Sequence, residues 1–344
     1  MSATEAAALP KPGEKPSSRY FALDGWRAIS ILMVLASHML PLGPHAWELN
    51  GASGQVGMSL FFTLSGFLIT QQLYAKRYIA SFFARRLFRI VPLAWAFTLV
   101  AALVVGGSVD QGAAHALFVS NYLHEHTMDG LDHFWSLCVE VHFYIGVGLF
   151  MALTRFRAFK AIPLFWLAIV LLRLVLAPQG TIETHLRVDE ILAGACLALV
   201  HLGLFGERPR ALLLRTPALL LLLGLLIASH PMTSYFGALR SFFAACLVGH
   251  TLFASEAGRY TWLGHRALRY VAEVSYALYV VHPLTYYGWM GSGDVLVRYT
   301  KRIGSFVLTF GLAHLSTFYF EHPMTELGRK VAKRLEPHRS SGTQ

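Results

Sequence analysis

The stretch LFRIVPLAWAFTLVAALVVG, residues 87–106, indicates the fold class, because its twenty residues include a single charged side chain, Arg89. A helix rises about 1.5 Å per residue, so about twenty residues cover the roughly 30 Å hydrocarbon core of a bilayer. Comparable apolar stretches recur along the chain after residue 20. The sequence therefore predicts an all-α, polytopic membrane protein.

The composition of the whole chain agrees with this class. Of its 344 residues, 55% are hydrophobic and 14% are charged, whereas soluble proteins carry about 25% charged residues. A disordered chain or a disulfide-stapled secreted module needs a different composition. The net charge of +10 would suit nucleic acid, but its distribution follows membrane topology. We therefore expect the lipid bilayer as a partner and no nucleic acid.

Ten segments have the length and apolarity expected of membrane-spanning helices. We predict them at residues 22–42, 54–74, 87–106, 133–153, 161–178, 188–205, 212–229, 235–254, 271–290 and 303–321. Residues 1–20 are expected to form a disordered cytoplasmic tail, residues 21–323 a single membrane domain, and residues 324–344 a basic cytoplasmic tail. We expect the membrane domain to act without an appended soluble domain.

Lys and Arg concentrate on one side of these predicted spans. With the N-terminus in the cytoplasm, 23 of the 29 Lys and Arg residues fall in cytoplasmic segments, as the positive-inside rule requires. The predicted outer loop at 107–132 has four carboxylates and no Lys or Arg. Both chain termini are therefore predicted to be cytoplasmic.

Ionisable residues within predicted spans are candidate functional groups, because burying a charge in lipid is costly. Arg27 and His38 lie eleven positions apart in LDGWRAISILMVLASH, which is about three helical turns and about 16 Å along one face. One interpretation is a functional stripe that joins a cation near the cytoplasm to a titratable base in the outer half. The other is that Arg27 pairs with Asp24 at the interface, while His38 bonds a neighbouring helix.

Three arginines lie together at the start of the third predicted span, in FFARRLFRIVP. Arg86 and Arg89 share a helix face at a spacing of three, and Arg85 and Arg89 share one at a spacing of four. Guanidinium groups gathered at a membrane boundary suit bidentate binding of phosphate. The alternative is that they only satisfy the positive-inside rule.

Glu140 lies about 10 Å into the fourth predicted span, where a carboxylate needs a partner. Two interpretations fit it: a carboxylate that orients His38, or a buried structural group that holds helices together.

Three further residues are candidate substrate-binding groups. Ser65 and Gly66 are small residues of the second span that let either a ligand or another backbone approach closely. His282, beside a proline in the ninth span, either lines a cavity or is a core histidine at a helix kink.

No metal site is predicted. His124, His126 and His133 stand among carboxylates, but the spacing of known zinc motifs is missing from the sequence. The three cysteines are isolated in apolar runs, which favours small core residues over disulfides.

Seven motifs follow one another along the chain: LDGWRAISILMVLASH, SLFFTLSGFLIT, FFARRLFRIVPLAW, FWSLCVEVHFY, RVDEILAGACLAL, VSYALYVVHPL and FEHP. In this order they resemble the membrane acyltransferase 3 family, and the chain looks like a bacterial inner-membrane O-acyltransferase. The resemblance covers nearly the whole chain after residue 20. It departs at Val141 and His142, where a second glutamate and a glutamine are typical, so acceptor details are not carried over from relatives.

This resemblance implies transfer of an acyl group from cytoplasmic acyl-CoA to a hydroxyl. The acyl group is usually acetyl, so acetyl-CoA would be the co-substrate, and no metal is implied. The acceptor hydroxyl commonly belongs to a sugar of a polysaccharide, lipopolysaccharide or other glycoconjugate.

The resemblance also implies roles for particular residues. It makes His38 the catalytic histidine and Arg27 its motif arginine. Arg27 and the arginine cluster at 85–89 would hold the phosphates of CoA. His38 would act as general base, with Glu140 or Asp24 fixing its tautomer, or would form an acyl-histidine intermediate.

A proton-coupled membrane transporter is the alternative function, because transporters also use intramembrane Arg, His and Glu residues. No internal repeat with paired broken helices is clear in the sequence, which counts against a transporter. Consumption of acyl-CoA by the purified protein would separate the two functions.

Overall fold

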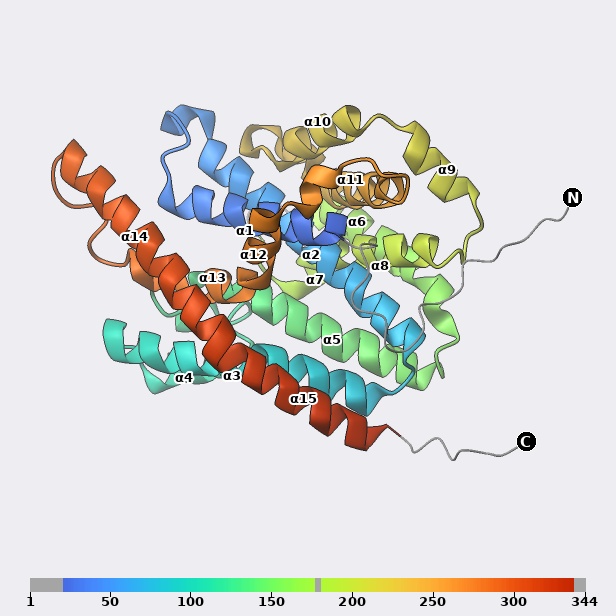
Figure 1. Ribbon diagram of the computed structural model, residues 1–344, viewed down its shortest axis with the longest axis horizontal. Coiled ribbons are helices and arrows are strands. Elements are labelled where there is room, and N and C mark those ends of the chain that lie inside the picture. The colour runs from blue at the N-terminus through green and yellow to red at the C-terminus, as the bar shows by residue number, and fades with distance from the viewer. Residues whose placement is uncertain (1–20, 177–180, 337–344) are drawn as a thin grey trace, which may run out of the picture.

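The computed structural model describes residues 21–176 and 181–336, and there the chain forms helices joined by short connections (Figure 1). The long helices are α1 (Phe21–Met39), α2 (Leu49–Ala75), α3 (Ile79–Val105), α5 (Trp135–Leu153), α6 (Ile162–Leu176), α8 (Asp189–His201), α10 (Ala218–Ser229), α11 (Arg240–Ser255), α14 (Val295–Ser316) and α15 (His322–Leu335). The short ones include α4 (Val109–Ala116), α7 (Thr184–Arg187), α9 (Arg208–Arg215), α12 (Arg266–Glu273), α13 (Ser275–Val281) and the 3-10 segment η6 (Pro231–Leu239). The predicted all-α class is confirmed, and the predicted tail at 1–20 lies outside the described residues.

Six helices within the described residues are long and apolar enough to cross a membrane. A seventh is added if α9 and α10, which are bent by 86° at their junction, count as one span. The predicted spans at 188–205 and 271–290 instead contain shorter helices, because α8 has 13 residues and the chain breaks between α12 and α13. Helix α1 also falls outside the set that meets these requirements. A multi-pass membrane protein is therefore shown.

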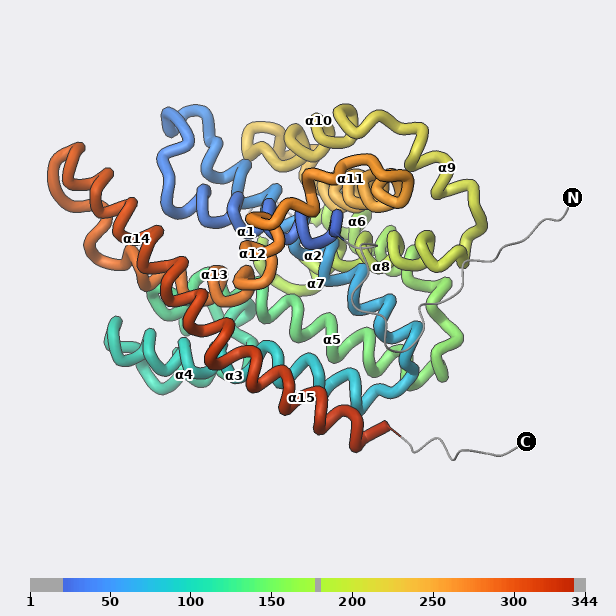
Figure 2. Tube along the Cα trace, viewed as in Figure 1, coloured from blue at the N-terminus to red at the C-terminus, as the bar shows by residue number. Residues whose placement is uncertain are grey.

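Helix α2 runs through the middle of the molecule and packs along α1 and α8 (Figure 2). Two glycines permit the contact with α8. A Cβ atom on Gly66 would lie 1.8 Å from the carbonyl oxygen of Ile191, and one on Gly194 would lie 1.9 Å from that of Thr63. Gly66 therefore brings two backbones together, and this packing role replaces the substrate-binding role predicted for it.

Adding a methyl group to a packed core usually costs about 1–3 kcal/mol of stability. We expect Gly66→Ala to reach the upper end of this range, because the added methyl group meets rigid backbone. Gly146→Ala in α5 is the matched control, since a Cβ atom there meets nothing within 4 Å. Thermal unfolding of the purified variants in detergent measures the difference. Equal melting temperatures for the two variants would contradict the packing role of Gly66.

A long helix crosses the molecule on the α3 side (Figure 1). It begins at Asp294, whose carboxylate accepts a hydrogen bond from the backbone N–H of Val297 at 2.8 Å. Helix α14, a π-helical turn at Thr317–Glu321 and α15 then continue to Leu335 without a break. Residues 324–335, assigned from the sequence to a basic tail, are thus part of a helix packed on α3.

Candidate functional site

Two cavities lie along helix α1, and the larger one contains His38. This cavity, which we call the histidine cavity, has a volume of about 710 Å³. It is lined by Val34, Ser37, His38, Asn50, Gly51, Gly54, Gln55, Met58, Ser120, His124, Thr127, Asp132, His133, Trp135, Ile182 and Tyr279. His38 comes from the last turn of α1, and its side chain is exposed to the cavity. The space is ample for one or two sugar rings.

Three histidines from distant parts of the chain meet at this cavity. The ring of His38 lies edge-to-face with that of His282, with centroids 5.2 Å apart, and His282 lies edge-to-face with His133 at 5.1 Å. The structure thus brings together His38 and His282, both singled out in the sequence. It adds His133, which the sequence suggested only as a discarded metal ligand.

The hydrogen bonds of the histidines define which nitrogens are free. Nδ1 of His282 donates to the carbonyl oxygen of Tyr279 at 2.8 Å, so the lone pair of the neutral ring lies on Nε2. Nδ1 of His38 lies 3.4 Å from Oη of Tyr286, which leaves Nε2 of His38 available. Among the described residues, no three His, Cys, Asp or Glu side chains are arranged to hold a metal ion.

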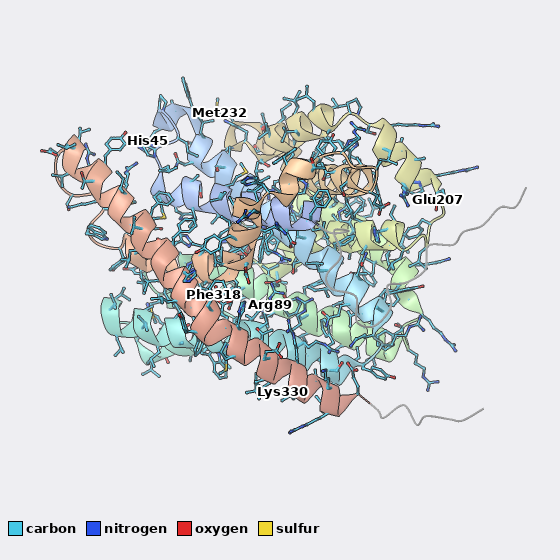
Figure 3. The ribbon with its side chains drawn as sticks, in the orientation of Figure 1. His45, Arg89, Glu207, Met232, Phe318 and Lys330 are labelled. Carbon is cyan, nitrogen blue, oxygen red and sulfur yellow. The ribbon has the colours of Figure 1, made fainter. Side chains whose placement is uncertain are left out.

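The second cavity, which we call the arginine pocket, lies about three helical turns away along α1, at Arg27. It is lined by Arg27, Phe61, Leu64, Ser65, Leu68, Arg86, Arg89, Ile90, Glu140, Tyr144, Ser275 and Tyr276. Figure 3 labels Arg89 beside the long helix that packs on α3. The pocket thus unites the arginines of α1 and α3 that the sequence proposed for phosphate binding.

Glu140 belongs to the arginine pocket and not to the surroundings of His38. Its Oε1 atom accepts a short hydrogen bond from Ser65 and another from Oη of Tyr144 at 2.5 Å. The guanidinium carbon of Arg86 lies 5.4 Å from the Tyr144 ring centroid. Ser65 is therefore tied to the carboxylate, and Glu140 orients the arginine pocket instead of the His38 imidazole.

Asp24 also lies on the arginine side. Its Oδ1 atom is 3.5 Å from Nη1 of Arg27, the pairing that the sequence offered as an alternative. In the part of the chain that the structure describes, neither Asp24 nor Glu140 contacts His38, so the predicted fixing of its tautomer is corrected. Asp24 and Glu140 are therefore the carboxylates beside Arg27 and Arg86, and Glu321 interacts electrostatically with Arg89.

Arg85 points away from the arginine pocket. Its Nη2 atom donates to Oε1 of Glu336 at 2.6 Å and to Oγ of Ser81 at the same distance. This hydrogen bond from Arg85 lowers the pKa of the Glu336 carboxyl. The predicted CoA-binding role of Arg85 is corrected, because adjacent residues on a helix are about 100° apart and Arg85 faces the end of α15.

A pair of aromatic rings separates the two cavities. Phe61 lines the arginine pocket and Tyr279 lines the histidine cavity, and their rings are stacked with centroids 6.1 Å apart and planes within 8°. The arginine pocket has a volume of about 40 Å³, room for about three water molecules. A ligand that reaches from one cavity into the other therefore needs the side chains between them to move.

The helices, the arginine pocket and the histidine cavity together define a multi-pass membrane protein with one buried pocket lined by arginines and a larger cavity lined by histidines. The model of the acyltransferase 3 family, described as an acyltransferase domain, matches residues 20–322. This chain belongs to the acyltransferase 3 family. The resemblance expected from the sequence motifs is thus confirmed.

Curated proteins that match this chain include O-acetyltransferases of Staphylococcus aureus. O-acetyltransferase OatA of strain NCTC 8325 is 28% identical over 219 residues, which cover 54% of this chain and 35% of that protein. A provisionally named O-acetyltransferase of strain COL is 31% identical over 198 residues, or 48% of this chain and 31% of that protein. The matched region thus spans about a third of each relative. No solved structure matches this chain significantly.

Proposed function

We propose that this protein is a membrane O-acyltransferase that moves an acyl group, in the first instance acetyl, from acyl-CoA to a hydroxyl of a sugar-containing acceptor. The single observation that carries this proposal is that helix α1 presents Arg27 to the arginine pocket and His38 to the histidine cavity. Family membership and the O-acetyltransferase relatives support the acyl chemistry. They also favour an enzyme over the proton-coupled transporter.

The donor end of the site is assigned to Arg27, Arg86 and Arg89. Their positive charges suit the phosphates of CoA, and planar guanidinium groups bind phosphate oxygens in pairs. Glu140, with its bonds from Ser65 and Tyr144, keeps the arginines from repelling one another by partly balancing their charge. The acyl group would then pass the Phe61–Tyr279 ring pair to reach His38.

The acceptor end of the site is assigned to His38 in the histidine cavity. With Nδ1–H of His38 donating to Tyr286, Nε2 takes the proton of the acceptor hydroxyl while that oxygen attacks the thioester carbonyl. The C–S bond breaks, an ester forms, and the proton from His38 is returned to the departing CoA thiolate. His282, whose Nε2 is free, lies beside His38 as a buried neutral neighbour and is outside the lining of the three cavities.

The membrane arrangement is part of the same proposal. We propose that the chain crosses the membrane ten times. Seven crossings are the six long apolar helices and the α9–α10 pair, and the other three are α1, α8 and the α12–α13 pair. Both termini are then cytoplasmic, in the inner membrane of a bacterium. The positive-inside distribution supports this orientation, because it places Arg27, Arg86 and Arg89 near the compartment that contains CoA.

Release of free CoA from acetyl-CoA by the purified full-length protein tests the proposal. We expect the thiol to appear faster when solubilised envelope glycans are added than when they are left out. Transfer of radiolabelled acetyl groups to the glycan fraction should match the thiol released. A protein that binds acetyl-CoA but releases no thiol with any glycan fraction would contradict acyl transfer and favour transport.

A further inference from the structure

A third cavity, separate from the two already described, lies between α6, α7, α10, η6 and α11. We call it the Arg240 cavity, and its volume is about 660 Å³. Its polar lining includes Gln55, Arg173, Arg187, Ser229 and Arg240. No role in donor binding or in the chemistry at His38 has been given to these residues above.

The Arg240 cavity adjoins the histidine cavity. Gln55 of α2 lines both of them. Arg187 lines the Arg240 cavity, and its guanidinium carbon lies 5.0 Å from the ring centroid of Trp135, which lines the histidine cavity. A single ligand can therefore occupy both cavities by passing over Gln55.

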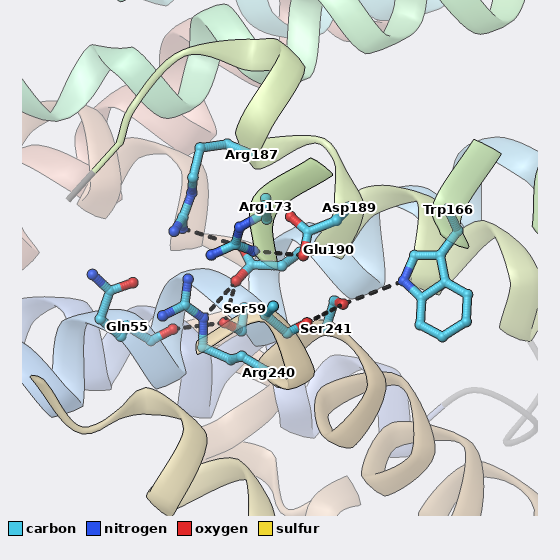
Figure 4. Close-up of polar contacts among 10 residues, drawn as sticks. Gln55, Ser59, Trp166, Arg173, Arg187, Asp189, Glu190, Arg240 and Ser241 are labelled. Carbon is cyan, nitrogen blue, oxygen red and sulfur yellow. Dashed lines mark hydrogen bonds and ion pairs between the residues drawn. The ribbon is translucent and has the colours of Figure 1, made fainter. Parts of the chain in front are cut away.

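The charges in the Arg240 cavity are unequal. Arg187 and Arg240 share one carboxylate, that of Glu190, at 3.2 and 2.6 Å (Figure 4). Arg173 has its own partner, because its Nη1 atom lies 2.6 Å from Oδ2 of Asp189. Three guanidinium groups thus face two carboxylates, and one positive charge in the interior lacks a counter-charge. Such a charge is costly to bury unless an anion accompanies it.

Hydrogen-bond donors at this cavity are also left without partners. Arg187 and Arg240 are 3% and 5% exposed, and Ser229 is 2% exposed. Within the described residues, Nε of Arg187, Nη2 of Arg240 and Oγ of Ser229 have no hydrogen-bond partner. Figure 4 shows the guanidinium groups of Arg187 and Arg240 on the same side as the Gln55 amide. Buried donors normally find an acceptor, and an oxyanion supplies several at once.

We propose that the Arg240 cavity binds an oxyanion, a phosphate or a carboxylate, carried by the acceptor. The sugar attached to that anion then extends past Gln55 and presents its hydroxyl to His38. Identifying the ligand as the acceptor rests on the proposed acyl transfer, whereas the anion site itself rests on the cavity. A phosphate would come from a lipid-linked glycan and a carboxylate from an acidic sugar.

Three amphiphiles with the same alkyl chain test the proposal on the purified full-length protein: dodecyl phosphate, dodecyl glucuronide and neutral dodecyl glucoside. We expect at least one of the two anionic compounds to raise the melting temperature by about 3 °C or more over the neutral one. A rise with the phosphate alone identifies a lipid phosphate, and a rise with the glucuronide alone identifies an acidic sugar. If neither exceeds the neutral compound, the proposal is overturned.

Gln55→Glu locates the binding in the Arg240 cavity. The substitution keeps the side-chain shape and adds a carboxylate that competes for the guanidinium groups, so we expect the Kd of the anionic amphiphile to rise about tenfold or more. Arg210→Gln is the control, because it changes the net charge by the same amount as Gln55→Glu. Arg210 pairs with Glu256 and lies outside the lining of all three cavities, so the Kd of the anionic amphiphile for this variant should stay within about twofold of normal. Equal Kd values for the two variants would refute the proposal.

The outcome is independent of the acyl chemistry, because this assay contains no acyl-CoA. Thiol release without anion binding would defeat the Arg240 cavity proposal and leave acyl transfer standing. Anion binding without thiol release would do the reverse: the anion site would stand, and its ligand would no longer be an acyl acceptor.

Discussion

His38→Ala is expected to lower acyl transfer by about 100-fold or more, which is the usual cost of losing a general base. The imidazole is exposed to the histidine cavity, and it touches its neighbours only through the edge of the His282 ring and a 3.4 Å contact with Tyr286. Its removal therefore takes away a basic nitrogen and little packing. Radiolabelled acetyl transfer to envelope glycans measures the activity, and thermal unfolding of the same preparation measures the fold.

His45→Ala is the matched control for this prediction. His45 follows α1 in the next turn, is exposed and lies outside the lining of the three cavities. The His45→Ala variant should therefore transfer acetyl groups at the normal rate. If His38→Ala keeps transfer within about threefold of normal, His38 is not the base.

The same variant separates the two forms of the reaction at His38. A covalent acyl-histidine would keep radiolabel on the protein after acetyl-CoA is supplied without an acceptor, and His38→Ala would lose that label. Direct transfer leaves the protein unlabelled in both cases. Retained label would make His38 the nucleophile, whereas an unlabelled protein is the result expected of a general base.

The pattern along one helix could be predicted from the sequence because helical geometry alone determines it. The spacing of Arg27 and His38 places them on one face of α1, and the structure opens a cavity at each of them. The pairing of Arg27 with Asp24 is equally local, since the two are three residues apart. Such relations need no knowledge of how helices pack.

Relations between helices could not be predicted in this way. Glu140 has a depth similar to that of His38, yet it lies against Ser65 and Tyr144, because depth says nothing about which neighbouring helix a side chain faces. His133 is brought to His282 across about 150 residues of chain, and no spacing in the sequence signals that contact.

The short or broken helices within two of the predicted spans could not be predicted for a related reason. Apolar stretches at 188–205 and 271–290 are buried by neighbouring helices, so they remain apolar while forming short or broken helices. The buried arginines of the Arg240 cavity are among the six Lys and Arg residues that fall outside the predicted cytoplasmic segments. Their partners Asp189 and Glu190 stand in the motif RVDEILAGACLAL. Charge next to an intramembrane carboxylate was the signal that could have identified them.

Arg86→Gln is expected to raise the KM for acyl-CoA about 10- to 100-fold, because a charge-assisted hydrogen bond to phosphate contributes about 1.5–3 kcal/mol. Arg86 lines the arginine pocket, where its guanidinium is held by Gln72 at 2.8 Å and by the face of Tyr144. Glutamine keeps a polar group, but it is shorter than arginine and carries no charge.

Arg85→Gln is a demanding control for that prediction, because it makes the same chemical change one residue earlier on the same helix. Arg85 is held by Glu336 at the end of α15, outside the arginine pocket. If the cluster acted only through its net positive charge near the membrane surface, the two variants would raise KM equally. If the pocket binds the phosphates of CoA, only Arg86→Gln raises the KM for acyl-CoA. Arg85→Gln then at most loosens the end of α15. Steady-state kinetics with acetyl-CoA as the varied substrate decides between a general electrostatic attraction and a defined binding site.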